Sequence, residues 1–458
     1  MNRVTKRTWL MGVFILILVL GMVIFLGEYT VKARKWVVFP GSPHVYNNAN
    51  IGLGTLTDRD GIILLDITDE RTYAADSDVR KATLHWLGDR KGFINAGAVS
   101  HYAAEMSGFD WINGLYDAEG TGGQLTLTLS AEVQKVALNA MAGRKGTVGV
   151  YNYKTGELLC AVTTPTYDPE NVPDIAGDTT GAWSGVYVNR FIQSAYVPGS
   201  IFKVVTTAAA LDCVEGIAGE GHFLNARREY GTEAVTCKKA HGTQNLKQAL
   251  ANSCNCAFSQ IAEQVGKKNM VAYVKKFGIT DSISFDGVTT AKGNYDVSEA
   301  APVSFAWSCI GQYNDLVNPA QYMTFMGAIA GGGSAAMPYL VSQAVGGGEV
   351  TYKAKTAETG KLLSAEVAGV LTEYMRNNVI VTYGADKFPD VKVCGKSGTS
   401  ELGGDLASNA MFSGFIADDR YPLAFVCVVE GGGAGAKTCV PVLNKVLRAC
   451  MAVLDAES

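Results

Sequence analysis

Ser200 and Lys203 are the residues of this chain whose types and spacing best suit chemistry. They lie three apart in the run YVPGSIFKVVTTAAAL, after a Pro-Gly turn and at the start of an apolar helical pattern. Residues three apart on a helix share a face, so the lysine is expected one turn beyond the serine on the same side. A lysine whose pKa is lowered by burial and by nearby positive charge can take the proton of a serine hydroxyl. The pair therefore predicts an activated serine nucleophile.

Two later motifs follow Ser200 in order. Ser253, Cys254 and Asn255 form the only Ser-x-Asn triplet of the chain, between the helical patterns NLKQALAN and AFSQIAEQV. The tetrapeptide KSGT, Lys396–Thr399, ends the β-like run DVKVC. The order SxxK, SxN, K[ST]G resembles that of penicillin-binding proteins and class A β-lactamases.

A second Lys-Thr-Gly, at Lys154–Gly156, precedes Ser200 and separates the alternating apolar runs GTVGVYNY and ELLCAV. Two such runs joined by a short polar segment are typical of a β-hairpin. We therefore interpret Lys154 as a turn residue and Lys396 as the lysine of the third motif.

Longer segments resemble the class B penicillin-binding proteins, the monofunctional peptidoglycan transpeptidases. The resemblance is nearly continuous from about Gln124 to the C-terminus, and QLTLTLSAEVQKVALNAM, AHGTQNLKQALANSCNCAF and CIGQYNDLVNPAQYMTFMGAIAGGG carry it together with the three motifs. From Trp36 to about Ala118 it is looser and depends mainly on TLHWLGDRKGFI. The chain departs from the family where SNAMF lacks a tryptophan that often precedes the phenylalanine.

The resemblance implies a catalytic role for five residues. Ser200 would attack the carbonyl of the penultimate D-alanine of a stem peptide, and Lys203 would take its proton. Ser253 would carry a proton to the departing D-alanine, while Asn255 would hold Lys203 and the substrate amide. Lys396 would be the counter-ion of the substrate's terminal carboxylate.

The resemblance also implies how substrate is bound. The hydroxyls of Ser397 and Thr399 would lie beside the carboxylate, and Gly398 would leave room for a substrate backbone along the strand. Backbone N–H groups of Ser200 and Thr399 would form the oxyanion hole. The amine of a second stem peptide would then resolve the acyl-enzyme and form the cross-link, and β-lactams would acylate the same serine.

The expected fold class is α+β, in the manner of serine DD-peptidases and β-lactamases. Strands are expected over 146–163 and 391–430 and a closing helix over 437–455, which together fit an antiparallel sheet covered by helices. A small mixed β domain is expected over 36–118 and the transpeptidase domain over 119–458. The first is too short for the glycosyltransferase domain of a bifunctional class A enzyme.

Residues 8–27, TWLMGVFILILVLGMVIFLG, carry no charge. A run of about 20 apolar residues spans the hydrocarbon core of a bilayer, so we expect a single-pass anchor with residues 1–7 in the cytoplasm and the catalytic domain outside. The alternative is a signal peptide cleaved near Val31 and Ala33. Basic residues flank both ends, so the orientation is inferred from the cell-wall substrate rather than from charge.

The net charge of −4 argues against a nucleic-acid partner. Of the ten cysteines, Cys160, Cys309 and Cys427 sit in apolar runs and are expected to be buried, whereas Cys213 and Cys237 are the first pair to test for a disulfide. With five histidines and no CxxC, neither a metal nor a cofactor is expected. A transpeptidase without its own polymerase domain implies a polytopic, glycan-polymerising membrane partner.

Two other functions are compatible with the motifs. A β-lactamase of the same fold needs a group that activates water, and no ExxLN segment follows the SxN motif. A membrane-tethered β-lactam sensor needs cytoplasmic output machinery, which the short N-terminal tail would not supply. Transpeptidation is therefore the expected activity.

Overall fold

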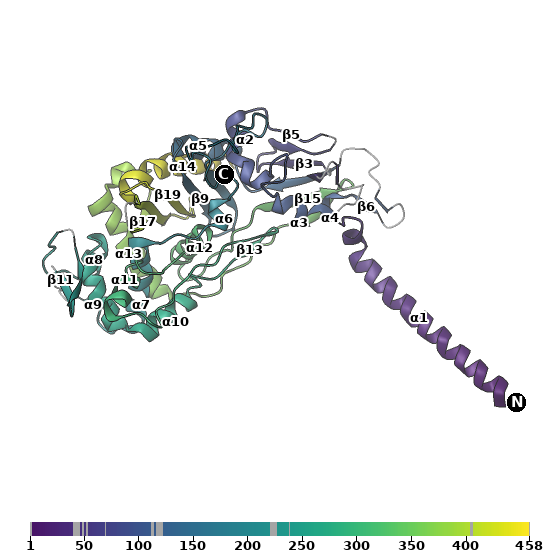
Figure 1. Cartoon of the computed structure of the whole chain (residues 1–458), viewed down its shortest axis with the longest axis horizontal. Coiled ribbons are helices and arrows are strands. Elements are labelled where there is room, and N and C mark those ends of the chain that lie inside the picture. The colour runs from purple at the N-terminus through teal and green to yellow at the C-terminus, as the bar shows by residue number, and fades with distance from the viewer. Residues whose placement is uncertain are drawn as a thin grey trace.

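The computed structural model describes residues 2–39, 46–47, 50–51, 54–68, 70–110, 114–115, 122–219, 227–237, 239–403 and 406–457. Along its longest axis it places an isolated helix at one end, a six-stranded sheet next to it, and a five-stranded sheet with helices on both faces beyond that (Figure 1).

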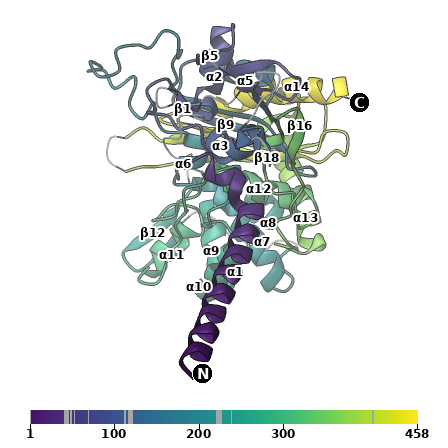
Figure 2. The same ribbon diagram turned by 90° about the vertical axis from the view of Figure 1, so that its right-hand side faces the viewer.

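Helix α1 (Asn2–Trp36) stands away from the rest of the molecule in Figure 1, and in Figure 2 it lies in front of the other helices, toward the viewer. Its most apolar stretch has a mean hydropathy of 3.0 and is not buried anywhere in the structure. At about 1.5 Å per residue the helix is longer than the hydrocarbon core of a bilayer, which is about 30 Å thick. The chain thus has one N-terminal helix long and apolar enough to cross a membrane, and it contains the predicted run 8–27.

The six-stranded sheet has the order β16 (Glu349–Lys353), β15 (Val341–Gly346), β8 (Gly123–Leu127), β3 (Gly54–Thr57), β4 (Ile63–Asp66) and β5 (Thr72–Tyr73). The neighbours are antiparallel except β3 and β8, which run parallel. Two of its strands come from residues 341–353, far along the chain. The division of the chain near residue 118 stays a prediction, while the sheet itself joins strands from both sides of it.

The five-stranded sheet has the order β10 (Leu158–Thr164), β9 (Gly146–Asn152), β19 (Leu423–Val429), β18 (Asn409–Ile416) and β17 (Val393–Ser400), with every neighbour antiparallel. All residues of β9, β10, β18 and β19 are buried because helices cover both faces. Helices α5 (Ala131–Met141) and α14 (Gly435–Glu457) cover one face, and α12 (Pro319–Ala330) covers the other. The predicted strands, closing helix and α+β class are confirmed.

A group of helices lies beyond the α12 face of this sheet. Its centre is α7 (Lys203–Cys213), whose first eight residues are all buried. A helix that is apolar on every side is expected to be surrounded by protein, and α7 contacts α8, α9, α10 and α13. These helices are α8 (Leu246–Ala251), α9 (Asn255–Val265), α10 (Lys267–Lys276) and α13 (Ala365–Asn378), and α11 (Pro302–Ser308) packs on α9.

The remaining elements are short. The helical ones are α2 (Ser77–Leu87), α3 (Gly97–His101), α4 (Ala103–Met106), α6 (Arg190–Gln193), η1 (Gly199–Phe202), η2 (Val379–Tyr383) and η3 (Ala385–Lys387). Four two-stranded ribbons pair β1 (Tyr46–Asn47) with β2 (Asn50–Ile51), β6 (Phe109–Asp110) with β7 (Gly114–Leu115), β11 (Arg227–Tyr230) with β12 (Glu233–Thr236), and β13 (Ser284–Phe285) with β14 (Val288–Thr289).

The Lys-Thr-Gly at Lys154–Gly156 forms the turn of the β9–β10 hairpin, as predicted. The Lys154 ammonium lies at the surface and pairs with Asp419 at 2.6 Å between Nζ and Oδ1. This lysine therefore has no part in the Ser200 region, and the interpretation of Lys154 as a turn residue is confirmed.

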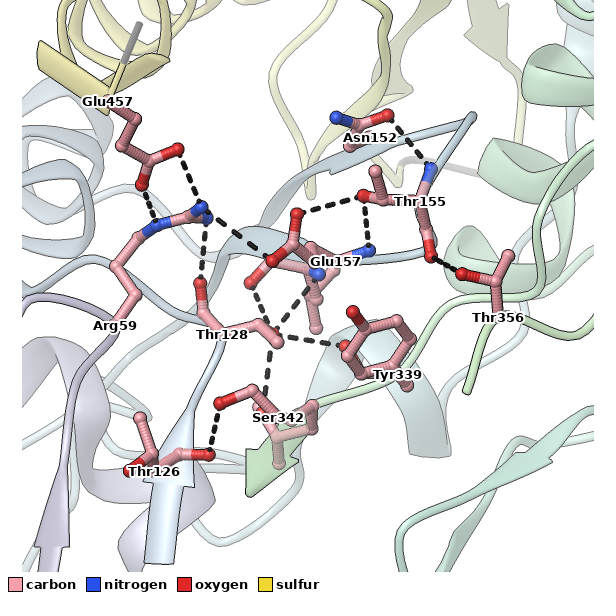
Figure 3. A network of polar contacts seen from close by, with 12 residues as sticks. Arg59, Thr126, Thr128, Asn152, Thr155, Glu157, Tyr339, Ser342, Thr356 and Glu457 are labelled. Atoms are coloured by element: carbon pink, nitrogen blue, oxygen red, sulfur yellow. Dashed lines mark hydrogen bonds and ion pairs between the residues drawn. The ribbon is translucent and has the colours of Figure 1, made fainter. Parts of the chain in front are cut away.

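Arg59 joins the two sheets (Figure 3). It follows β3, and its guanidinium donates to both carboxylate oxygens of Glu457, at the end of α14, at 2.8 and 3.1 Å. The same group donates to the carbonyl of Thr128 at 3.3 Å and lies 3.8 Å from the carboxylate of Glu157, at the β9–β10 turn. The Arg59 side chain is only 9% exposed, so these bonds are shielded from water on one side.

We predict that Arg59→Ala lowers the melting temperature of the chain by a few degrees. Hydrogen bonds to charged groups contribute about 1.5 to 3 kcal/mol each when shielded, and the partial exposure of Glu457 places the loss toward the lower value. Differential scanning fluorimetry measures the shift. Thr356→Ala, which removes one exposed hydroxyl bond to the Thr155 carbonyl, is the matched control, and equal melting of the two variants would contradict the role of Arg59.

Candidate active site

Ser200 lies in the 3₁₀ turn η1, directly before α7. The sequence predicted the first turn of a helix, and the structure differs only in the tighter winding of that turn. Gly199 has a φ of +54°, and a Cβ added there would lie 2.5 Å from the carbonyl oxygen of Thr399. Glycine is needed at this position because the turn lies directly against β17.

Lys203 is the first residue of α7, and its side chain is completely buried. Its Nζ donates to the Ser253 carbonyl at 2.7 Å, to Asn255 Oδ1 at 2.7 Å and to Ser253 Oγ at 3.2 Å. The ammonium also lies 5.4 Å from the centre of the Phe258 ring. All three of these hydrogen bonds go to the SxN motif.

The turn between α8 and α9 explains how Ser253 reaches Lys203. The N–H groups of Ser253 and Cys254 donate to the carbonyls of Leu250 and Ala249 at 3.2 and 3.0 Å, which is a Schellman ending of α8. That ending places Ser253 in the left-handed region, with φ +52°, where a non-glycine residue is strained. Its carbonyl and hydroxyl then both face Lys203. The N-cap of α9 is Cys254 rather than Ser253.

Lys396 lies on β17, and its side chain is completely buried as well. Its Nζ donates to Ser253 Oγ at 3.1 Å and to the Ser397 carbonyl at 2.8 Å. Ser253 Oγ thus bridges the two lysine amines, at 3.2 Å from Lys203 and 3.1 Å from Lys396.

Burial controls the protonation of both lysines. Desolvation lowers the pKa of Lys203 well below its usual value, and the positive charge of Lys396 lowers it further. Desolvation also lowers the pKa of Lys396 to about 7. A lowered pKa favours the neutral amine, which can accept a proton, and this suits Lys203 to general-base chemistry.

Strand β17 is an edge of its sheet and pairs only with β18 among the described strands. A Cβ at Gly398 would lie 2.8 Å from the Pro198 carbonyl and 3.0 Å from Ile201 Cγ2. Glycine at this position therefore allows β17 to lie against the Ser200 turn. This differs from the sequence argument, in which Gly398 left space for a substrate backbone.

The predicted residues meet at one cavity of about 360 Å³. Its walls include Ser200, Ser253, Asn255, Ser397 and Thr399, while Lys203 and Lys396 reach Ser253 from inside the protein. The other lining residues are Cys237, Lys239, His241, Asn252, Trp307, Ile310, Gln312 and Glu401. A serine hydroxyl in the wall of a cavity that two buried amines approach through Ser253 suits acyl transfer on a substrate that bears a carboxylate.

Tyr383 is a residue of this region that sequence reasoning missed. It ends the turn η2, and its hydroxyl oxygen lies 3.0 Å from both the backbone N and the Oγ of Ser397. Trp307 and Glu401 were missed as well. None of the three lies within the SxxK, SxN or KSG motifs, so only their positions in space connect them with the cavity.

The cysteines follow the predictions in part. Cys160, Cys309 and Cys427 are buried as expected. The proposed pairing of Cys213 with Cys237 is not formed, because both thiols are free and the Cys237 sulfur lies against Cys254 and Cys256 instead.

Comparisons with known proteins identify relatives of this chain. The family model described as the penicillin-binding protein transpeptidase domain matches residues 146–448, a range that contains all three motifs. The peptidoglycan D,D-transpeptidase PbpA of Mycolicibacterium smegmatis is 29% identical over 339 residues, which cover 68% of this chain and 68% of that protein.

Two solved structures have the same fold. The D,D-transpeptidase domain of a peptidoglycan glycosyltransferase from Eggerthella lenta is 26% identical, with a TM-score of 0.73 over 87% of this chain and 98% of that one. Penicillin-binding protein A of Mycobacterium tuberculosis, as a penicillin G acyl-enzyme complex, is 22% identical, with a TM-score of 0.73 over 87% of this chain and 99% of that one.

We predict that the rate constant of Ser200 acylation by a penicillin rises with pH through the pKa of Lys203, because only the neutral amine can accept the serine proton. Lys396→Ala removes a positive charge that lowers the pKa of Lys203, so the acidic limb of the profile should move to higher pH. Stopped-flow acylation between about pH 5 and pH 9 measures this limb.

Lys154→Ala is the matched control for Lys396→Ala, because Lys154 lies in the other Lys-Thr-Gly sequence and pairs with Asp419 at the surface. Its acidic limb and its acylation rate near neutral pH should stay within a few-fold of the parent chain. An unshifted limb in Lys396→Ala, or an equal shift in both variants, would contradict the coupling of the two buried lysines.

Proposed function

The chain belongs to the penicillin-binding protein transpeptidase family, and from this premise we propose that it cross-links peptidoglycan stem peptides through an acyl-enzyme on Ser200. The observation that carries the proposal is the pair of buried lysine amines that share the Ser253 hydroxyl, at the cavity that Ser200 also lines. The D,D-transpeptidase name of the M. smegmatis relative supports the substrate class.

In the first step, Ser200 Oγ attacks the carbonyl carbon of the penultimate D-alanine, and Lys203 Nζ accepts the hydroxyl proton. The complete burial of Lys203 and its lowered pKa support this role. Backbone N–H groups of Ser200 and Thr399 are the proposed donors to the oxyanion, a contribution of about 3 to 4 kcal/mol per donor in other acyl-transfer enzymes.

In the second step, the bond between the carbonyl carbon and the terminal D-alanine nitrogen breaks, and Ser253 Oγ passes a proton to that nitrogen. The bridging position of this hydroxyl between two amines supports a proton relay, since it can take a proton from one side and give it on the other. Asn255 positions Lys203 through Oδ1, while its Nδ2 donates to the Thr236 carbonyl at 3.1 Å.

Substrate binding is assigned to β17. Lys396, a buried residue of this strand, is the proposed counter-ion of a carboxylate. Ser397 and Thr399 of the same strand line the cavity. An edge strand can pair with an extended peptide through its backbone, which places the scissile carbonyl over Ser200. The amine of a second stem peptide then attacks the ester carbonyl, releases Ser200 and forms the cross-link.

We propose that α1 is retained as a membrane anchor with residues 1–7 in the cytoplasm, and that a polytopic, glycan-polymerising membrane protein contacts residues 8–118. The six-stranded sheet lies beside α1, while β17 and α9, which carry residues of the cavity, lie farther from it, and this supports the arrangement (Figure 1).

The retained anchor predicts an intact N-terminus in the membrane fraction, released by detergent and not by high salt. Mass spectrometry of the purified chain tests it. A chain that starts after Ala33 would instead identify a cleaved signal peptide.

We predict that Ser200→Ala abolishes covalent labelling by a fluorescent penicillin while the melting temperature stays near that of the parent chain. Loss of the nucleophile removes the acylated atom, and nucleophile loss in a serine hydrolase costs about a millionfold in rate. Labelling of the gel-resolved protein, followed by mapping of the modified peptide, measures this. Labelling that persists in the variant, or maps to another serine, would contradict the assignment.

The release rate of the bound penicillin separates transpeptidation from β-lactam hydrolysis. Glu401 lines the same cavity, and a carboxylate there is the residue to test as an activator of water. A transpeptidase is expected to hold the acyl group for minutes or longer. Release faster than about one per second is an ordinary enzymatic rate. Such release would favour a β-lactamase if the Glu401→Gln variant loses it.

A further inference from the structure

Three thiols and an imidazole surround the Ser253 turn, and the proposed reaction uses none of them. Cys237 follows β12, and its Sγ lies 3.4 Å from Cys254 Sγ and 3.5 Å from Cys256 Sγ. A ring nitrogen of His241 and the sulfurs of Cys237 and Cys254 all lie within 4.8 Å of one another. Within the part of the chain that the structure describes, this is the one group of potential metal ligands of this kind.

Backbone N–H groups donate to two of the three sulfurs. The backbone N–H of Cys256 donates to Cys237 Sγ at 3.3 Å, and that of Ala257 donates to Cys254 Sγ at 3.4 Å. Both N–H groups belong to the first turn of α9, where unpaired N–H groups and the helix dipole stabilise negative charge. Thiolates, not thiols, are metal ligands.

His241 adds an independent observation. Its Nδ1 is buried and has no hydrogen-bond partner among the described residues. Buried polar nitrogens are nearly always satisfied by a protein group, a water or an ion. The imidazole lies in the wall of the Ser200 cavity together with Cys237, and one of its ring nitrogens lies within 4.8 Å of the sulfurs of Cys237 and Cys254.

We propose that Cys237, Cys254 and His241, with Cys256 as the fourth ligand, bind a structural zinc ion beside the acylation site. Zinc favours a tetrahedral set of cysteine sulfurs and histidine nitrogens, and bonds of about 2.3 Å place neighbouring sulfurs about 3.8 Å apart. The two observed sulfur separations are close to that value. The Cys256 thiol, which donates to the Val235 carbonyl at 3.4 Å, turns from that oxygen to the metal as it loses its proton.

A disulfide is the competing use of these cysteines. A bond between two sulfurs needs a separation of about 2.05 Å, and it would employ two of the three thiols without giving His241 Nδ1 a partner. A zinc ion uses all four groups. Three thiolates and a divalent cation carry one net negative charge, so the complex adds no positive charge near Lys203 and Lys396.

The zinc ion has a positioning role, because four protein ligands leave no open site for chemistry. Cys254 separates Ser253 from Asn255, and Cys256 follows Asn255, so a metal bound to both cysteines holds the two Lys203 partners from either side. The left-handed conformation of Ser253 is strained and has to be held by its neighbours. The same ion ties Cys237, at the end of the β11–β12 ribbon, to the start of α9.

Metal analysis of the full-length chain tests the proposal. The protein is extracted in detergent without chelators, and plasma mass spectrometry is expected to find about one zinc per chain, the content of a single closed site. Cys237→Ser and His241→Ala should lose most of that zinc, whereas Cys213→Ser, which changes a cysteine outside the group, should keep it.

A second measurement does not depend on whether the variants fold. Removing zinc from the parent chain with a chelator should lower its melting temperature and slow penicillin acylation at least about tenfold, the usual minimum cost of disturbing a metal site's surroundings, and added zinc should restore both. Zinc content is read without penicillin, so a failure of Ser200 labelling and a failure of this proposal are separate results.

Three outcomes would overturn the zinc site. The first is a parent chain purified without zinc. The second is an equal zinc content in the parent chain and in Cys237→Ser, which would identify adventitious metal. The third is a zinc-free chain in which peptide mapping finds Cys237 in a disulfide with Cys254 or Cys256.

Discussion

The rest of the active region depends on burying the amine of Lys203. A lysine ammonium removed from water is costly unless it is hydrogen-bonded or loses its proton. Here both conditions operate together, because the SxN motif offers two oxygens at 2.7 Å and desolvation lowers the pKa. The same burial that makes the residue expensive for stability lowers its pKa and so favours the base role proposed for it. Function at Ser200 is therefore obtained from a feature that would be unfavourable elsewhere in the fold.

The packing around α7 keeps that amine dry. The helix lies among α8, α9, α10 and α13, and its apolar residues on every side leave no face for water. The turn between α8 and α9 then supplies the polar partners in a strained conformation, and β17 brings Lys396 against the other side of Ser253. Each of the three motifs thus contributes a different group. The SxN motif supplies the Ser253 hydroxyl, and the amines of Lys203 and Lys396 reach it from α7 and β17.

The three cysteines near the SxN turn can add to its support. A turn with a left-handed serine at its centre requires support from outside its own backbone, and the sulfurs of Cys237, Cys254 and Cys256 lie where such support can act on both sides of Asn255. The absence of a CxxC pattern led the sequence argument away from a metal. The proposed ligands come from the end of a ribbon, a loop and the first turn of a helix, so no single local spacing describes them.

The sequence by itself determined what depends on neighbouring residues. Alternating apolar runs identified the β9–β10 hairpin and thereby excluded Lys154, and the apolar run 8–27 identified the helix α1. The three motifs, with their order and flanks, identified the family and predicted the residues that the structure brings together at one cavity. Only the tertiary structure decided how these pieces meet. It places Gly398 against the Ser200 turn and adds residues 341–353 to the N-terminal sheet. It also brings the Tyr383 hydroxyl to Ser397 and the His241 ring to Cys237 and Cys254. Hydrophobic periodicity and turn chemistry act over a few residues, whereas contacts between distant segments are set by the packing of whole helices and sheets, which no local pattern records.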